Sequence, residues 1–210
     1  RQDIMSFEEI ARIATLTASL GVTKFRLTGG EPLLRADLHK LVSKLHTIPG
    51  VEIALTTNGT LLKKHAQLLA DSGLNRVTVS LDSLDDQTFR QMNDVDFPVE
   101  AVLEGIEAAD YFGLGPIKIN AVVRKGVNDH TLLELATYFR GTPHIVRFIE
   151  YMDVGNSNGW VMDEVIPSGR VITQIGNVFP LEKLPSNYSG EVASRYRYKD
   201  GAGEIGLISS

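Results

Sequence analysis

A regular alternation of short strand-like segments with longer helix-like ones constrains this chain more than any other feature. Five segments have the composition and two-residue alternation typical of strands: residues 24–28, 51–57, 76–81, 117–123 and 145–150. Segments with apolar residues three or four positions apart separate them, as amphipathic helices would. Such alternation is typical of parallel βα units, whose crossovers are right-handed. The sequence therefore predicts an α/β fold built on a doubly wound sheet or a barrel.

Local signals mark the ends of several predicted helices. Ser6 and Glu9 have the spacing of a capping box, so a helix is expected from this point to Gly21. Its apolar face would consist of Ile10, Ile13, Ala14, Thr17 and Leu20. Further helices are expected over residues 61–72, 100–112 and 129–139. Asp129 is the expected N-cap of the last of them.

The pattern changes after residue 160. One more helix is expected over residues 168–175. Residues 193–199 and 204–209 alternate like strands and are joined around Asp200-Gly201, which is typical of an antiparallel hairpin. The last part of the chain therefore departs from the parallel βα pattern.

Overall composition excludes several classes of protein. With 210 residues and 43% hydrophobic content, the chain can bury one substantial core, and its net charge of −5 argues against a general nucleic-acid surface. It contains no apolar run of about 18 residues, so no membrane span is expected. It has no cysteine, which excludes disulfides and any iron–sulfur cluster held by cysteine within these residues.

Positive charges recur on one face of the predicted strands. Lys24 and Arg26 alternate with apolar residues, and Lys118 and Arg147 do the same on later strands. Central parallel strands are usually apolar on both faces, and burying unpaired charges costs several kcal/mol each. These cations therefore need anionic partners or water. A phosphorylated ligand in a partly open barrel satisfies this need, and the alternative is that strand-end charges reach solvent at the barrel rim.

A turn rich in glycine follows the first predicted strand. Paired glycines at Gly29 and Gly30 allow a sharp turn and let a ligand approach the backbone closely. Glu31 adds a carboxylate that could bind a ligand's ammonium group. The alternative is an ordinary strand-to-helix turn without a ligand.

Polar residues also end two other strands. Thr56-Thr57-Asn58 and Ser80-Leu81-Asp82 fall at carboxyl ends, where barrel enzymes place their chemistry. Each signal is weak alone, because these residue types are common in turns. The five histidines show no ligand spacing and are interpreted as surface or packing residues.

The string Thr28-Gly-Gly-Glu-Pro-Leu-Leu-Arg35 resembles the signature of the radical S-adenosylmethionine (SAM) superfamily. The resemblance implies that the Gly-Gly-Glu-Pro turn holds the methionine end of SAM. It also implies an iron–sulfur cluster held by a cysteine loop after the first strand, and that loop is expected upstream of Arg1. The expected fold is therefore an incomplete parallel (β/α) TIM-type barrel over residues 1–160, without its first strand and cluster loop. A truncated C-terminal extension, the helix plus the hairpin, would occupy residues 161–210.

Further motifs narrow this resemblance to the GTP 3′,8-cyclase family of molybdenum-cofactor biosynthesis. They are residues 55–59, 79–82 and 147–155, with a tail pattern at 190–193 and 206–210. The resemblance implies that a reduced [4Fe-4S] cluster cleaves SAM to a radical that abstracts the ribose 3′-hydrogen of GTP, after which C3′ bonds to C8 of guanine. It also implies a second [4Fe-4S] cluster, a bacterial cytoplasmic homodimer, and a product passed to cyclic pyranopterin monophosphate synthase. No nucleic-acid or membrane partner is expected.

The resemblance also implies site residues. The SAM-contacting positions would be Gly29, Gly30, Glu31, Ser80 and Met152. The GTP-contacting positions would be Lys24, Arg26, Thr56, Lys118 and Arg147. No catalytic residue or metal ligand is assigned. Without cysteines, these 210 residues alone are expected to be inactive.

Two other functions remain open from sequence. One is a radical SAM enzyme that acts on a peptide, because Thr-Gly-Gly-Glu-Pro is shared across the superfamily. The other is a cluster-free module that binds a nucleotide for regulation. Cysteines in the flanking gene sequence would exclude the second.

Overall fold

The computed structural model describes residues 4–93, 96–155, 159–187 and 190–209. The chain divides into two compact units, each made of two stretches of sequence. The first unit comprises residues 1–79 and 101–117, and the second comprises residues 80–100 and 118–210.

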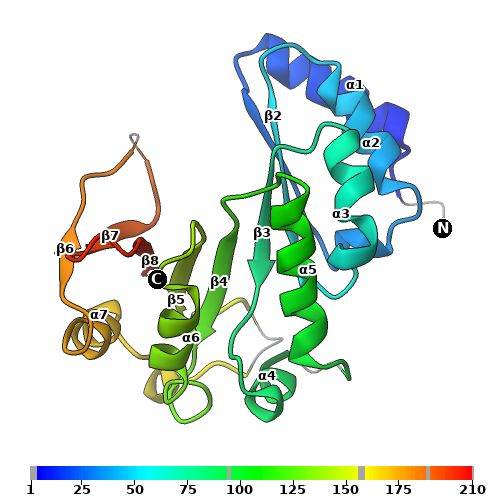
Figure 1. Cartoon of the computed structure of the whole chain (residues 1–210). Helices are drawn as coiled ribbons and strands as arrows, with labels where there is room; N and C mark the ends of the chain where they lie inside the picture. Colours follow the sequence, from blue (N-terminus) through cyan, green and yellow to red (C-terminus); the bar gives the residue numbers. More distant parts are fainter. Residues whose placement is uncertain (1–3, 94–95, 156–158, 188–189, 210) are drawn as a thin grey trace. The chain divides into compact units, whose positions relative to one another are not determined.

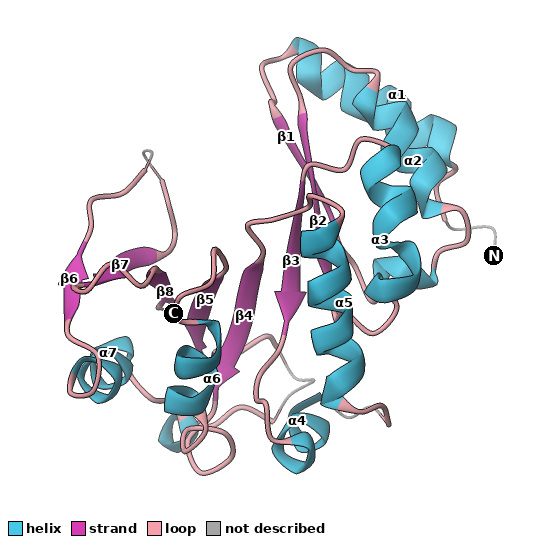
Figure 2. Ribbon diagram, in the orientation of Figure 1, coloured by secondary structure: helices cyan, strands magenta, loops and turns pink. Residues whose placement is uncertain are grey.

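Three parallel strands form one layer of the first unit (Figure 1). They pair in sequence order: β1 (Lys24–Leu27), β2 (Glu52–Thr57) and β3 (Arg76–Ser80). Their helices lie on one side of the strands, as Figure 2 shows: α1 (Phe7–Ser19), α2 (Leu38–His46), α3 (Leu62–Asp71) and α5 (Val99–Tyr111). A 3-10 turn, η1 (Pro32–Leu34), joins β1 to α2. The predicted parallel order of these strands is confirmed.

The helical face of the first unit is buried as its periodicity predicts, except in α1. Leu41 and Leu45 of α2 are almost fully buried, and Leu62 and Leu69 of α3 are too. The capping box of α1 is confirmed by a 2.7 Å bond from the Ser6 amide to Glu9 and a 3.2 Å bond from the Glu9 amide to the Ser6 hydroxyl.

The predicted apolar face of α1 is wrong in extent. Ile13 is 50% exposed and Leu20 is 84% exposed, and among the described residues of α1 only Ala14 is buried. The reason is that α1 packs mainly against α2.

The second unit combines parallel and antiparallel strands. β4 (Lys118–Val123), β5 (Ile145–Glu150) and β8 (Glu204–Ile208) are parallel neighbours, and β7 (Ser194–Tyr198) then β6 (Leu181–Lys183) continue antiparallel. Its helices are α4 (Asp86–Asn93), α6 (Leu132–Phe139) and α7 (Ser168–Gly176). The predicted C-terminal helix and hairpin are confirmed, and the hairpin extends the sheet begun by β4 and β5. Taken unit by unit, the fold is the predicted α/β type with mostly parallel strands.

Two local predictions fail in the second unit. Asp129 is not the N-cap of α6, which starts after Thr131; its carboxylate accepts the Gly126 amide at 2.8 Å and so closes the preceding turn. Helix α4 is absent from the sequence prediction because its residues are mostly polar. Asp85 begins this helix by accepting hydrogen bonds from both the amide and the hydroxyl of Thr88, at 2.8 and 2.7 Å.

Among the described residues, no helix has the length and apolar character needed to cross a membrane.

A buried carboxylate stands just after β3. Asp82 is 7% exposed, and its Oδ1 accepts the amide of Val122 on β4 at 2.7 Å. Asn128 also connects these two segments, because its Nδ2 donates to the backbone oxygens of Asp82 and Val122 at 2.9 and 2.7 Å. Burial raises the pKa of Asp82 to about 6, although hydrogen bonds from Val122 and the Asn93 side chain oppose the rise.

This raised pKa predicts a specific pH dependence of stability. An acid whose pKa is higher in the folded state than in the unfolded state stabilises the fold most below its unfolded pKa. The rise in the pKa of Asp82 from 3.8 to about 6 corresponds to roughly 3 kcal/mol of stabilisation of the folded state. This stabilisation is lost as the pH increases through about 6. Relative to Asp82→Asn, the free energy of unfolding of the wild type should therefore fall by most of that amount between pH 4 and pH 7.5.

Denaturant titrations at several pH values measure this difference. Asp71→Asn, at an exposed position on α3, is the control and should follow the wild type. Parallel curves for wild type and Asp82→Asn would show that burial of Asp82 does not perturb its ionisation.

Candidate functional site

The turn after β1 leaves its backbone open. Gly29 has a φ of +143°, a conformation that side chains other than glycine rarely adopt, whereas Gly30 has no such restriction. A Cβ atom built at either glycine would meet nothing within 4 Å. Both residues are exposed. The turn therefore offers a strip of accessible backbone that the rest of the first unit does not fill.

The Glu31 carboxylate is bound within the chain. Its Oε1 accepts the Leu33 amide at 2.9 Å and the Thr57 hydroxyl at 2.7 Å, and its Oε2 accepts the Asn58 amide at 2.7 Å. Leu33 belongs to η1, whereas Thr57 and Asn58 lie at the end of β2. Glu31 thus connects the glycine turn to the carboxyl end of the neighbouring strand.

Arg26 crosses the polar face of all three strands in the first unit. Its Nη1 donates to Thr56 on β2 at 2.8 Å and to Thr78 on β3 at 3.2 Å. No carboxylate among the described residues lies within ion-pair distance of Arg26. Two hydroxyls orient this guanidinium without neutralising its charge, which leaves it available to an anion.

Lys24 is in a different electrostatic setting. Its Nζ lies 3.2 Å from Glu52, and the same carboxylate also accepts from Arg76. Burial by itself raises the pKa of Glu52, but hydrogen bonds from Arg76 and Lys24 outweigh it and hold that pKa below its ordinary value. Two cations share one carboxylate here, so the cluster keeps an excess of positive charge.

The remaining sequence-predicted residues belong to the second unit. Lys118 and Arg147 are half-buried and alternate with buried Ile119 and Val146, as predicted. Arg147 pairs in register with Asn120 and donates from Nε to its side-chain oxygen at 2.9 Å. Ser80 and Met152 are half-buried; Ser80 ends β3 and Met152 follows β5.

The structure therefore groups the predicted residues by unit. Within the first unit it brings Arg26 to Thr56 and places Gly29, Gly30 and Glu31 in one turn. Within the second it places Lys118 and Arg147 on one strand face.

Four contributing residues were missing from the sequence-predicted set. They are Glu52, Thr57, Arg76 and Thr78. The alternation of β2 and β3 is the signal that could have found three of them, because Glu52, Arg76 and Thr78 lie on the same strand face as Arg26. Thr57 points to the opposite face; its place among the polar residues that end β2 is visible in the sequence, but its contact with Glu31 is not.

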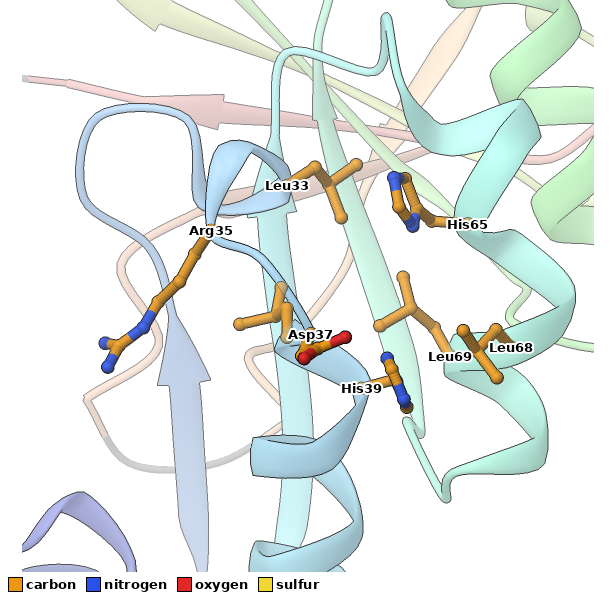
Figure 3. A pocket seen from close by; sticks show the side chains of 8 residues that line it. Leu33, Arg35, Asp37, His39, His65, Leu68 and Leu69 are labelled. Carbon is orange, nitrogen blue, oxygen red and sulfur yellow. The ribbon is translucent and has the colours of Figure 1, made fainter. Parts of the chain in front are cut away.

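A small cavity lies beside η1 in the same unit (Figure 3). It has a volume of about 130 Å³, and its lining includes Leu33, Leu69, His39 and His65. Burial lowers the pKa of His65, which favours its neutral form. Across the described residues no three His, Asp or Glu side chains form a group that could hold a metal. The cavity is thus a hollow beside η1 whose lining combines leucines with polar side chains.

Comparison with known families decides the class of protein. The sequence model of the radical SAM superfamily matches residues 1–139. The chain belongs to the radical SAM superfamily. A second family model, Molybdenum Cofactor Synthesis C, matches residues 144–210. The superfamily predicted from the Gly-Gly-Glu-Pro turn is confirmed.

Curated relatives cover the whole chain. A protein named GTP 3′,8-cyclase from Acidothermus cellulolyticus is 54% identical over 211 residues, covering 100% of this chain and 58% of that protein. A protein of the same name from Xanthomonas axonopodis pv. citri is 49% identical, covering 100% of this chain and 63% of that protein. The chain spans about three fifths of the length of these radical SAM relatives.

Solved structures of low identity share the fold. Streptococcus suis SuiB bound to S-adenosylmethionine matches with a TM-score of 0.70 and 20% identity, over 83% of this chain and 40% of that one. A radical SAM methyltransferase from Sphaerobacter thermophilus matches with a TM-score of 0.59 and 18% identity, over 82% of this chain and 52% of that one. These likenesses support the fold prediction.

The superfamily implies SAM and an iron–sulfur cluster, and the residues present fit only the first. The backbone at Gly29 and Gly30 is exposed and has open space beside it, which is compatible with a ligand such as SAM approaching the turn. The chain has no cysteine, so it supplies none of the thiolate ligands that such a cluster uses.

Proposed function

We propose that this chain is the central part of a GTP 3′,8-cyclase, which converts GTP to (8S)-3′,8-cyclo-7,8-dihydroguanosine 5′-triphosphate in the first step of molybdenum-cofactor biosynthesis. The observation that carries this proposal is the 46–54% identity to curated relatives of that name along the entire chain. The unneutralised cation on β1 supports it independently, because GTP is a polyanion.

Two sets of residues serve the two ligands in this proposal. SAM is held by Gly29, Gly30, Ser80 and Met152, with Glu31 beside them. GTP is held by Lys24, Arg26, Thr56, Lys118 and Arg147. The assignment follows the family resemblance residue by residue and agrees with the charge on the strand faces.

The chain's own part in the chemistry is to bind and to orient. Arg26 presents a guanidinium held by two hydroxyls, and charge-assisted bonds of this kind fix a phosphate as well as attract it. The glycine turn admits SAM by leaving space that any side chain would fill. SAM, when bound, supplies the radical chemistry, as cofactors do for steps that side chains cannot perform. Ligands for two [4Fe-4S] clusters lie outside these 210 residues in this proposal.

Partners follow from the same proposal. We propose a homodimer whose product is passed to cyclic pyranopterin monophosphate synthase.

An anaerobic assay tests the proposed function. A cluster-loaded protein that contains this chain should convert GTP, with SAM and a reductant, to a 3′,8-cyclised nucleotide and 5′-deoxyadenosine. ATP in place of GTP should give no cyclised nucleotide, and the 210-residue chain alone should be inactive. Formation of 5′-deoxyadenosine with a peptide substrate, but no cyclised product with GTP, would instead favour a peptide-modifying enzyme.

A further inference from the structure

The sequence alone suggests that the Glu31 carboxylate binds a ligand's ammonium group, but its contacts indicate another role. A carboxylate has about four acceptor positions. Glu31 uses three of them on donors of its own chain: the amides of Leu33 and Asn58 and the hydroxyl of Thr57. These donors belong to two segments, η1 and the end of β2. The carboxylate therefore joins its own turn to residues that are 26 and 27 positions away in sequence.

Thr57 continues this connection into the loop after β2. Its side chain is inside the unit, with 2% of the residue exposed, so it cannot touch a ligand at the turn. While its hydroxyl donates to Glu31 at 2.7 Å, its oxygen accepts the Gly59 amide at 3.1 Å. One hydroxyl thus links the carboxylate to the backbone of the loop.

The loop itself is fixed by close packing. A Cβ at Gly59 would lie 2.8 Å from Val102 of α5, and a Cβ at Gly105 would lie 2.5 Å from the Gly59 carbonyl oxygen. Because an added Cβ atom would not fit at either glycine, the loop and α5 already pack closely. The loop therefore has no room to move towards α5. Glu31 is therefore anchored to a rigid part of the first unit.

Packing constrains the turn itself much less. A Cβ at Gly29 or Gly30 meets nothing within 4 Å, and the cavity of about 130 Å³ adjoins Leu33 (Figure 3). Where side-chain packing is sparse, hydrogen bonds determine the position of the backbone. The amides of Leu34 and Arg35 form local bonds within η1, and the carboxylate of Glu31 adds the bonds that connect the turn to the end of β2.

We propose that Glu31 and Thr57 are positioning residues that fix the Gly29-Gly30 turn in the shape that receives SAM. The carboxylate of Glu31 acts on its own chain, and the accessible backbone of the turn faces the ligand. The identity of the ligand as SAM rests on the proposed function, whereas the positioning of the turn does not.

Amide hydrogen exchange tests the positioning directly on this chain, without any cofactor. Thr57→Val keeps the side-chain volume but removes the hydroxyl, and Glu31→Gln removes one of two acceptor oxygens. Exchange at the Leu33 and Asn58 amides should rise in Glu31→Gln at whichever site loses its acceptor, roughly 10- to 100-fold. Thr57→Val should raise exchange at Gly59 and through the turn, and Thr57→Ser should restore it. Thr15→Val, which removes an exposed hydroxyl on α1, is the matched control. Unchanged exchange in both site variants would overturn the proposal.

Ligand titration tests the connection to SAM. In a cluster-loaded protein that contains this chain, Thr57→Val should weaken SAM binding by roughly tenfold, and Thr57→Ser should recover most of it. GTP affinity should stay within about twofold, because Thr57 points away from the strand face that carries Arg26. Unchanged SAM affinity despite faster exchange at the turn would overturn the positioning role in ligand binding. An unmutated protein that binds no SAM would refute the proposed function, and the exchange measurements would still decide whether Glu31 fixes the turn.

Discussion

Gly30→Val should abolish SAM cleavage while leaving the fold intact. A Cβ at Gly30 meets no protein atom within 4 Å, and its φ does not require glycine, so valine fits the folded chain. The same space is the one proposed for the methionine end of SAM, and a branched side chain would occupy it. We expect formation of 5′-deoxyadenosine to fall roughly 100-fold or more, even without GTP, because small displacements of a reactant have effects of that size.

Gly169→Val provides a matched control for this prediction. Gly169 also has open space around its Cβ position and a φ outside the glycine-favouring region, but it lies on α7 in the second unit. Both variants should melt close to the wild-type temperature, and only Gly30→Val should lose SAM cleavage. Normal SAM cleavage by a correctly folded Gly30→Val protein would remove Gly30 from the SAM site.

Arg26→Ala should weaken GTP binding by roughly 1.5–3 kcal/mol, the range for a hydrogen bond to a charged group. That change corresponds to roughly a 10- to 150-fold increase in Kd. The size of the effect follows from the setting of Arg26, whose partners are the neutral hydroxyls of Thr56 and Thr78. A guanidinium already neutralised by a carboxylate would contribute far less to anion binding. Lys118→Ala should have an effect of similar size if it contacts the triphosphate.

Calorimetric titration with GTP, set beside thermal melts, measures these effects. Arg197→Ala is the control, because Arg197 is an exposed cation paired with Glu182 on the hairpin. Thr78→Val should give a smaller loss than Arg26→Ala, since Arg26 would keep its 2.8 Å bond to Thr56. Wild-type GTP affinity in both Arg26→Ala and Lys118→Ala would refute a polyanion site on these strands.

Strand faces were the most predictable part of the fold. The two-residue period of a strand fixes which side chains share a face, so the amino-acid sequence alone separates Lys24 and Arg26 from Phe25 and Leu27. The Gly-Gly-Glu-Pro turn was predictable for a similar reason, because its geometry is local to a few residues. Both predictions depend on short-range rules alone.

Contacts between distant segments were not predictable in this way. The partners of Glu31 include residues 26 and 27 positions away. Glu52 on β2 pairs with Lys24 on β1 and with Arg76 on β3. Helix α4 was missed because its polar sequence carries little apolar periodicity, with Thr88 and Phe89 as its buried residues. The exposure of α1 depends on where that helix packs, which its own sequence does not encode.

Two separate sites underlie the proposed function: the glycine turn receives SAM, and the cationic strand face receives GTP. Crossed titrations of both ligands into Gly30→Val and Arg26→Ala, in a cluster-loaded protein that contains this chain, test this separation most directly. We expect Gly30→Val to lose SAM and retain GTP, and Arg26→Ala to lose GTP and retain SAM. Equal loss of both ligands in both variants, or loss of neither, would contradict it.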